Sequence, residues 1–366
     1  MNKKNLAAAA SVLAVSALCV QGAQAQSSVQ VYGRLNVDVE HISFSKPTGA
    51  TSGDVTRLSS NSSRLGFRGV EALGDGLKAI YQIEASVGVD SGSGTLAGRD
   101  TFVGLEGGWG RLRLGFFDDV FKGMGEYTDR YKGTGIGNDA TIATLGGGGG
   151  GFTRTQVNSL RYDSPTVNGF KGELQYGLED EQHGGKTALT AAASYSRGKL
   201  KLGAGLGRHD NFLPGRHDMA YRLGAKYDFG VVDVAGGVTR LSYQLASGDV
   251  TRDYWTVSLG YKVGAGVLSA KYGAAGDGRG SAPDGATTQV GSDGARLVKG
   301  PRSGATTYVL GYEHNLSKRT QLYAYATRIA NEARANYRFG TNGLNSAAAG
   351  PGASPTGWVM GMSHDF

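Results

Sequence analysis

The chain has 366 residues and a formal net charge of +7, and it combines 62 glycines and 7 prolines with 18 tyrosines, 12 phenylalanines and 3 tryptophans. Disordered chains are poor in aromatic residues, so this composition excludes a disordered protein and assigns the glycines to ordered strands and turns. The single cysteine, Cys19, excludes an intramolecular disulfide framework.

The first 25 residues have the features of a secretory signal peptide. Lysines at positions 3 and 4 precede 15 apolar or small residues at 6–20, and Ala23-Gln24-Ala25 forms a small-residue cleavage site. The apolar stretch is shorter than the roughly 20 residues of a membrane-spanning helix. We therefore expect residues 1–25 to be removed, which leaves an exported domain at 26–366 without any cysteine.

From residue 29 onward, apolar and polar side chains alternate with period two. Between Val29 and Glu40 the odd positions are apolar or glycine, whereas the even positions are polar. A similar alternation returns at 170–178 and at 221–229. A period of two places one set on each face of a β-strand. The apolar face would meet a core in a soluble sandwich and lipid in a membrane barrel, so this alternation alone leaves both folds open.

The connections between the predicted strands fall into two length classes. Short turns occur at 74–76, 107–110, 168–169, 197–199, 228–230, 264–266 and 315–319. Longer polar stretches alternate with them around 45–54, 88–98, 118–154, 179–188, 209–218, 244–252, 273–303 and 330–355. Eight loops and seven turns require 16 strands, with both termini on the short-turn side. This pattern predicts an all-β fold, a 16-stranded antiparallel transmembrane β-barrel with short periplasmic turns, long extracellular loops and a water-filled interior.

The last nine residues predict the strand that closes this barrel. Trp358, Met360, Met362 and Phe366 share one face, and mostly small or polar residues occupy the other. A soluble domain rarely ends on an aromatic residue in a paired strand, because termini usually fray. A barrel in lipid requires its last strand to pair with its first. We therefore expect Phe366 to serve barrel closure and assembly.

Charged residues of the early strands and of the longest loop define a candidate constriction. The alternation directs Arg64, Arg68 and Arg113 into the lumen, because their apolar neighbours face lipid. The longest loop, the third, begins at 118, and we expect it to fold inward and face this basic wall. We assign the acidic side of the constriction to its residues Asp118, Asp119, Glu126 and Asp129, and the loop also carries Lys122, Arg130 and Lys132. Six consecutive glycines at 146–151 predict a backbone with no single preferred conformation.

Several sequence blocks occur in the order found in one known family. They are SSRLGFRG at 62–69, EALGDGLKAIYQIE at 71–84, GRLRLG at 110–115, NSLRYDSP at 158–165 and GYEHNLSKRT at 311–320, with the terminal Phe366. With them the chain resembles the Gram-negative general porins, most closely the anion-preferring trimeric porins of betaproteobacteria. The resemblance implies an outer-membrane homotrimer whose third loop lies in the pore. It also implies constriction roles for Arg64, Arg99 and Arg154, although strand parity would turn Arg99 toward lipid unless a bulge or strand end intervenes.

The resemblance and the predicted geometry together indicate a general diffusion porin. We expect a passive, water-filled channel for small hydrophilic solutes and ions with a weak preference for anions, surrounded by outer-membrane lipid and lipopolysaccharide. A substrate-specific channel of the same fold is the alternative, and a barrel enzyme is less favoured because nothing pairs His41 or His209 with a nucleophile. We expect no enzymatic activity, cofactor or metal. Nucleic acid is also not expected as a partner, because the basic residues are spread over many strands.

Overall fold

The strands form one antiparallel sheet that is divided into 18 segments within the described residues. The computed structural model describes residues 28–45, 54–131, 135–147, 150–178, 185–212, 214–288, 295–340 and 350–366. β2 (Asp54–Ser60) and β3 (Arg64–Gly74) both pair with β1 (Ser28–Phe44), and β5 (Gly94–Thr95) and β6 (Thr101–Gly107) both pair with β4 (Leu77–Val87). Each of these two pairs is therefore one interrupted strand, and the described ranges hold 16 strands. The predicted signal peptide, 1–25, lies outside the described residues.

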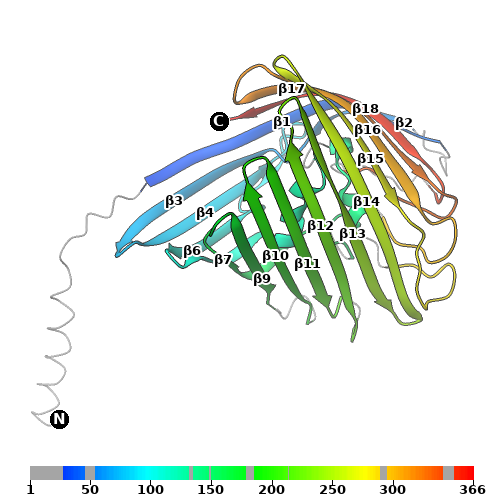
Figure 1. Cartoon of the computed structure of the whole chain (residues 1–366), viewed down its shortest axis with the longest axis horizontal. Coiled ribbons are helices and arrows are strands. Elements are labelled where there is room, and N and C mark those ends of the chain that lie inside the picture. The colour runs from blue at the N-terminus through cyan, green and yellow to red at the C-terminus, as the bar shows by residue number, and fades with distance from the viewer. Residues whose placement is uncertain are drawn as a thin grey trace, which may run out of the picture.

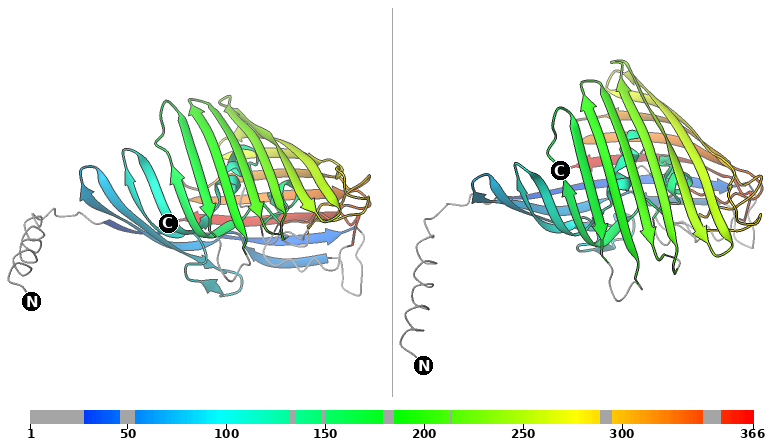
Figure 2. Two further views of the ribbon diagram at one scale, coloured as in Figure 1. Left: turned by 90° about the horizontal axis from the view of Figure 1, so that it is seen from below. Right: turned by 60° about the horizontal axis from the view of Figure 1, so that its bottom comes forward.

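The sheet closes on itself. β1 pairs on one side with β2 and β3 and on the other with β18 (Pro355–Asp365), and every other strand pairs with its neighbours in sequence. The resulting ring is seen from three directions in Figures 1 and 2. The remaining strands are β7 (Gly110–Asp118), β8 (Thr155–Asp163), β9 (Phe170–Gly177), β10 (Thr187–Arg197), β11 (Leu200–Asp210), β12 (His217–Asp228), β13 (Val232–Leu245), β14 (Gly248–Val263), β15 (Gly266–Ala275), β16 (Ala305–Asn315) and β17 (Thr320–Asn331). The predicted 16-stranded barrel is confirmed.

The outer face of the ring is apolar and exposed. Val29 and Met360, on the first and last strands, are 65% and 64% exposed, whereas Asp38 and Glu40 on the other face of β1 are buried. A soluble protein would place these two sets the other way round. The arrangement fits a sheet whose outward side chains face lipid and whose inward side chains line the interior.

All seven predicted short turns are present, and one predicted loop is wrong. β13 runs to Leu245 and β14 begins at Gly248, with these two residues paired across a tight hairpin. The stretch 244–252 is therefore mostly strand. Its polar residues occupy strand ends and do not form a long loop.

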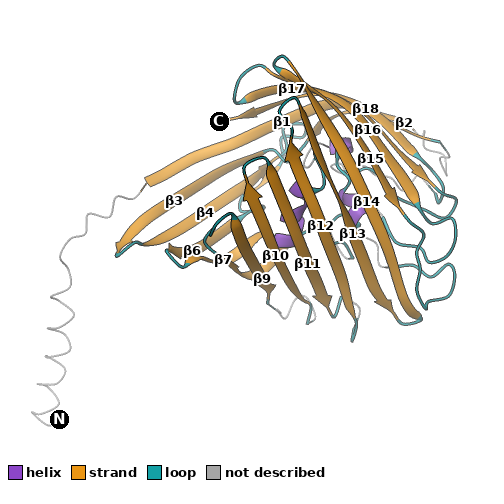
Figure 3. Cartoon of the chain, in the orientation of Figure 1, coloured by secondary structure: helices purple, strands orange, loops and turns teal. Residues whose placement is uncertain are grey.

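The third long loop lies inside the ring, as the helices in Figure 3 show. It contains the short helical segments α2 (Val120–Gly123), η1 (Met124–Tyr127), η2 (Gly135–Gly137) and α3 (Ala140–Thr144). α2 packs against β9, β10 and β11, α3 against β13 and β14, and η2 against β17 and β18. The loop thus touches opposite parts of the wall, as expected for a segment that crosses the interior. In the described ranges, no helix is long and apolar enough to cross a membrane.

The carboxyl terminus lies in the seam that closes the ring. The backbone N–H of Phe366 donates to the carbonyl of Gly33 at 3.1 Å, and the N–H of Gly33 donates back to Phe366 at 3.1 Å. The Phe366 ring covers Gly33 so closely that a methyl group at position 33 would collide with it. The last residue therefore completes the pairing between the first and last strands.

Candidate pore constriction

A cavity of about 660 Å³ lies between the barrel wall and the third loop. We call it the loop–wall cavity. Its cationic lining residues are Arg34, Arg64, Arg99, Lys122 and Arg222, and its acidic ones are Asp118, Glu126, Asp129 and Asp139. Among the residues that line this cavity, five cations therefore face four carboxylates.

Two of the predicted arginines meet at one carboxylate. The Arg99 Nε donates to Glu84 Oε1 at 2.6 Å, and the Arg64 Nε lies 3.6 Å from Glu84 Oε2. The hydroxyl of Tyr32 donates to the same Oε2 at 2.9 Å. Glu84 therefore holds both guanidinium groups side by side on the wall and leaves them with one net positive charge.

Arg99 reaches the cavity because it precedes its strand. β6 begins at Thr101, so the alternation within that strand does not extend to Arg99. The Arg99 backbone N–H donates to the Glu84 carbonyl at 3.1 Å, which fixes the chain beside β4. The strand end that would free Arg99 from the lipid-facing parity is therefore present, because β6 begins only at Thr101.

Two further arginines line the cavity and were left out of the predicted set. Arg34 lies opposite Arg64 in the register of β1 and β3, and its Nε donates to Asp365 Oδ1 at 2.6 Å. Arg222 projects from β12, donates to Thr239 Oγ1 at 3.0 Å and lies over the Phe121 ring. Both occupy polar positions of an alternating strand, so parity gives their face. It does not give their height along the barrel.

Three predicted basic residues lie away from the loop–wall cavity. Arg68 is four residues from Arg64 along β3, which is about 13 Å, and its Nε donates to Gln30 Oε1 at 2.9 Å. Arg113 is buried against the Asp163 carboxylate. Arg154 lies with its guanidinium 4.6 Å from the centre of the Phe212 ring. An inward face therefore did not bring Arg68 or Arg113 to the cavity, and Arg154, which the resemblance assigned to the constriction, is not among its lining residues.

Three of the four predicted acidic residues of the loop line the loop–wall cavity. Asp118 and Glu126 line the cavity, and Asp118 accepts a 2.6 Å hydrogen bond from Lys122 Nζ. Asp129 also lines it but is 4% exposed and forms a 2.9 Å ion pair with the fully buried Lys271 of β15. Asp129 therefore mainly anchors the loop to the wall, and its charge, which is paired with Lys271, contributes little to the potential in the passage.

Asp119 is a buried residue of the loop and caps a helix. It is 3% exposed, and its Oδ1 accepts a 2.6 Å hydrogen bond from the backbone N–H of Lys122 at the start of α2. Burial raises the pKa of Asp119 to about 7, although the Lys122 hydrogen bond and charge oppose this shift. Asp119 is not among the residues that line the loop–wall cavity.

Asp139, which the sequence did not single out, is a third buried acid of the loop, after Asp119 and Asp129. Its Oδ2 accepts a 2.8 Å hydrogen bond from the Tyr254 hydroxyl of β14. Burial raises its pKa to about 6, and the charge of Asp129 adds to this effect. It therefore carries a weaker negative charge near neutral pH than an exposed aspartate.

The eighth long loop also contributes to the cavity. The Thr141 hydroxyl donates to the Arg338 carbonyl, and Asn138 Nδ2 donates to the Gly340 carbonyl at 3.4 Å. Gly340 itself is a lining residue. Sequence reasoning treated 330–355 only as a long outer loop, because contacts between two loops leave no periodic signal.

The glycine run of the third loop is described at four of its six positions. Gly146 and Gly147 line the cavity, and the carbonyl of Gly150 accepts a 2.6 Å hydrogen bond from the Tyr243 hydroxyl. Positions 148 and 149 lie outside the described residues. The conformational variability predicted for the run stays a prediction.

Comparisons with known proteins agree with this geometry. A family model described as Gram-negative porin matches residues 7–334. Outer membrane porin protein 32 of Delftia acidovorans is 29% identical over 373 residues, covering 97% of this chain and 99% of the relative. The solved anion-selective porin from Comamonas acidovorans has a TM-score of 0.75 at 25% identity, covering 93% of this chain and 100% of that one. OmpT of Vibrio cholerae, solved in a trimer form, shares the fold with a TM-score of 0.63 at 16% identity, covering 93% and 99%.

Proposed function

This chain belongs to the Gram-negative porin family and is an outer-membrane porin, and from this premise we propose how its interior selects solutes. Small hydrophilic solutes and ions diffuse passively through the barrel, and the loop–wall cavity is the narrowest part of their route. The passage prefers anions weakly. The chain catalyses no reaction.

The charge balance of the loop–wall cavity carries this proposal. Arg34, Arg64 and Arg99 come from neighbouring parts of the wall, and the loop carboxylates of Asp118 and Asp129 are each paired with a lysine. Fixed charges act more strongly in a narrow passage with low-dielectric walls than on an open surface. Beside Glu84, Arg64 and Arg99 keep one positive charge between them, which supports a weak rather than a strict preference. The similarity to an anion-selective porin supports the same sign.

We assign no catalytic role to His209, which lies near the end of β11. His209 stacks between Phe152 and Phe212, with ring centroids 4.1 and 4.5 Å away. Within the described residues, neither of its ring nitrogens has a hydrogen-bond partner. This packing supports a structural residue and disfavours a general base.

The functional unit in this proposal is a homotrimer embedded in outer-membrane lipid and lipopolysaccharide. The apolar outer faces of β1 and β18 can pack against a neighbouring subunit as well as against lipid, because residues such as Val31 and Met360 are well exposed. A related fold has been solved as a trimer. Sedimentation of the protein extracted in mild detergent tests this assembly, and a monomer under every mild condition would contradict it.

Solute flux tests general diffusion directly. In liposomes that contain the purified protein, the swelling rate should fall smoothly as neutral sugars increase in size, and the conductance should grow with salt without saturating. A substrate-specific channel would instead give saturation with one solute class and a low rate with others of equal size. Such saturation would contradict the proposal.

A further inference from the structure

The outward face of β14 changes from apolar to charged at a defined height. Its outward residues from the short turn upward are Val263, Tyr261, Leu259, Val257 and Trp255, all exposed. They span nine residues, within the roughly 9–11 that a tilted strand needs to cross the apolar part of a membrane. Asp253 is the next outward residue. It therefore lies just beyond the aromatic boundary, where lipid headgroups begin.

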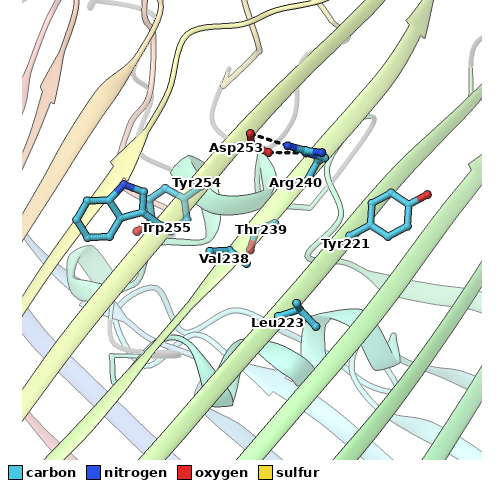
Figure 4. A pocket seen from close by; sticks show the side chains of 8 residues that line it. All are labelled: Tyr221, Leu223, Val238, Thr239, Arg240, Asp253, Tyr254 and Trp255. Carbon is cyan, nitrogen blue, oxygen red and sulfur yellow. Dashed lines mark hydrogen bonds and ion pairs between the residues drawn. The ribbon is translucent and has the colours of Figure 1, made fainter.

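A hollow of about 620 Å³ opens on the outer face below this boundary (Figure 4). Tyr221 of β12 and Trp255 of β14 flank it, and Leu223 and Val238 lie between them. All four side chains occupy outward positions of their strands and are exposed. The hollow is therefore an apolar groove with the width of about two strands, open toward the lipid.

A charged cluster lies at the upper edge of the hollow. Arg240 of β13 donates through Nε and Nη2 to the two oxygens of Asp253, at 2.6 and 2.9 Å. Arg279, from the loop after β15, donates through Nη2 to Asp253 Oδ2 at 2.5 Å. Among the described residues, two guanidinium groups thus share this one carboxylate. Arg240 and Arg279 remain 58% and 65% exposed, so they are accessible from the membrane side.

We propose that this face binds a phosphorylated lipid of the outer leaflet. An acyl chain lies in the hollow between Tyr221 and Trp255, and the phosphate contacts Arg240 and Arg279. The cluster has one uncompensated positive charge, which an anionic headgroup neutralises. Guanidinium groups have planar N–H donors that match phosphate oxygens, and most of those on these two arginines are not used by Asp253.

A nearby ion pair serves as a matched control. Arg208 of β11 also faces outward, and its Nη2 lies 2.8 Å from Asp210 Oδ1 on the same strand. This pair joins one cation to one anion and is half-exposed, like the cluster around Asp253. Because its charge is balanced, it offers no excess for a phosphate.

Native mass spectrometry of the purified full-length mature protein tests the proposal. The protein, in dodecyl maltoside, is titrated with dioleoylphosphatidic acid, a lipid with a phosphate monoester headgroup, and separately with dioleoylphosphatidylcholine. We expect phosphatidic acid to bind more tightly than phosphatidylcholine. The double variant Arg240→Gln/Arg279→Gln should weaken this binding roughly thirtyfold, given the contribution of each of the two surface arginines to anionic lipid binding. Arg208→Gln should leave it unchanged.

A variant with the opposite expected effect guards against a simple loss of folding. Asp253→Asn removes the carboxylate that competes with phosphate, so it should strengthen binding of phosphatidic acid. Equal binding of both lipids, or unchanged affinity in the double variant and in Asp253→Asn, would overturn the proposal. Dissociation of the native oligomer in the double variant would also overturn it, because the face would then be a contact between copies of this chain.

Discussion

At the scale of single residues, the basic wall depends on the carboxylate of Glu84. This side chain contacts both Arg64 and Arg99, so it fixes their positions and removes one of their two charges. Its neutral isostere would leave the size of the wall unchanged and raise the local charge by one. Substitutions can therefore either lower or raise the positive charge of the wall.

Changing the charge of the wall should change ion selectivity predictably. Arg64→Glu lowers the local charge by two, and we expect the ratio of anion to cation permeability to fall by roughly thirtyfold or more, because roughly 1 kcal/mol per charge in a hydrated passage gives about 2 kcal/mol. Glu84→Gln should raise the ratio. Zero-current potentials across a salt gradient measure both effects.

Arg111 provides the control for these variants. It lies at the short-turn end of β7 and is paired with Glu106 at 2.7 Å, away from the loop–wall cavity. Arg111→Glu should shift the zero-current potential much less than Arg64→Glu. Equal shifts in the two variants would mean that selectivity is set elsewhere.

Asp119 predicts a pH dependence of stability. Its folded pKa of about 7 lies above the ~3.9 of an unfolded chain, so the folded loop keeps a proton that the unfolded chain releases between about pH 4 and pH 7. The stability that this proton contributes is lost as the pH rises through that window. Asp119→Asn keeps a helix-capping side chain but has no such proton.

Thermal unfolding at pH 5 and pH 8 measures this contribution. The native protein should unfold at a lower temperature at pH 8 than at pH 5, and the difference should be smaller in Asp119→Asn. The same pH dependence in both proteins would show that Asp119 titrates normally.

The sequence could supply the face of each site residue but not its height or its partner. Arg64 and Arg68 have the same parity on one strand, yet only Arg64 lines the loop–wall cavity. Arg113 also points inward, but Asp163, 50 residues further along the chain, holds it elsewhere. Such distant partners are set by the closed sheet and have no local signal.

At the scale of elements, the third loop is held to the wall by buried polar contacts. Lys271 of β15 contacts Asp129 and the Gly137 carbonyl, and Arg252 of β14 donates to the carbonyls of Ile142 and Ala143. These contacts bridge the loop to strands more than 100 residues away. They account for an inward position that loop length alone only suggested.

Breaking the Lys271 pair should release part of this loop. Lys271→Met leaves the Asp129 carboxylate buried without its cation, a situation that costs about 3–5 kcal/mol in buried pairs. We expect noisier single-channel currents with frequent partial closures. The control is Lys171→Met, because Lys171 is half-exposed and its partner Glu173 also contacts Arg161. Quiet currents in Lys271→Met would contradict an anchoring role.

The strand ends show where periodicity was insufficient. Gln244 and Asp249 look like loop residues in sequence because the strands leave the apolar band before they turn. Their outward positions face a polar environment above the lipid, so alternation disappears while pairing continues. The alternation therefore predicted which strands exist. It did not predict where they end on the side opposite the short turns.

Removing the last residue should impair assembly more than conduction. Deletion of Phe366 removes two backbone hydrogen bonds to Gly33 and the ring that covers it. We expect less protein in the outer membrane, measured by quantitative immunoblotting of membrane fractions, and normal conductance in the channels that do form. A truncated protein at normal levels would refute this prediction.

At the scale of the whole molecule, the closed ring, the apolar outer face and the inward loop follow from one pattern. Period-two alternation and the sorting of connections by length predicted the barrel, and the seam between β1 and β18 confirms it. The signal peptide at 1–25 stays a prediction. The interior charges then decide what the channel prefers.

The zero-current potential of the native protein in a planar bilayer tests the central claim most directly. With a tenfold salt gradient at low ionic strength, its sign should indicate that anions are more permeant. The preference should shrink as salt rises, because screening shortens the reach of the wall charges to about 10 Å at 0.1 M. A potential of the opposite sign, with cations preferred at low salt, would contradict the account.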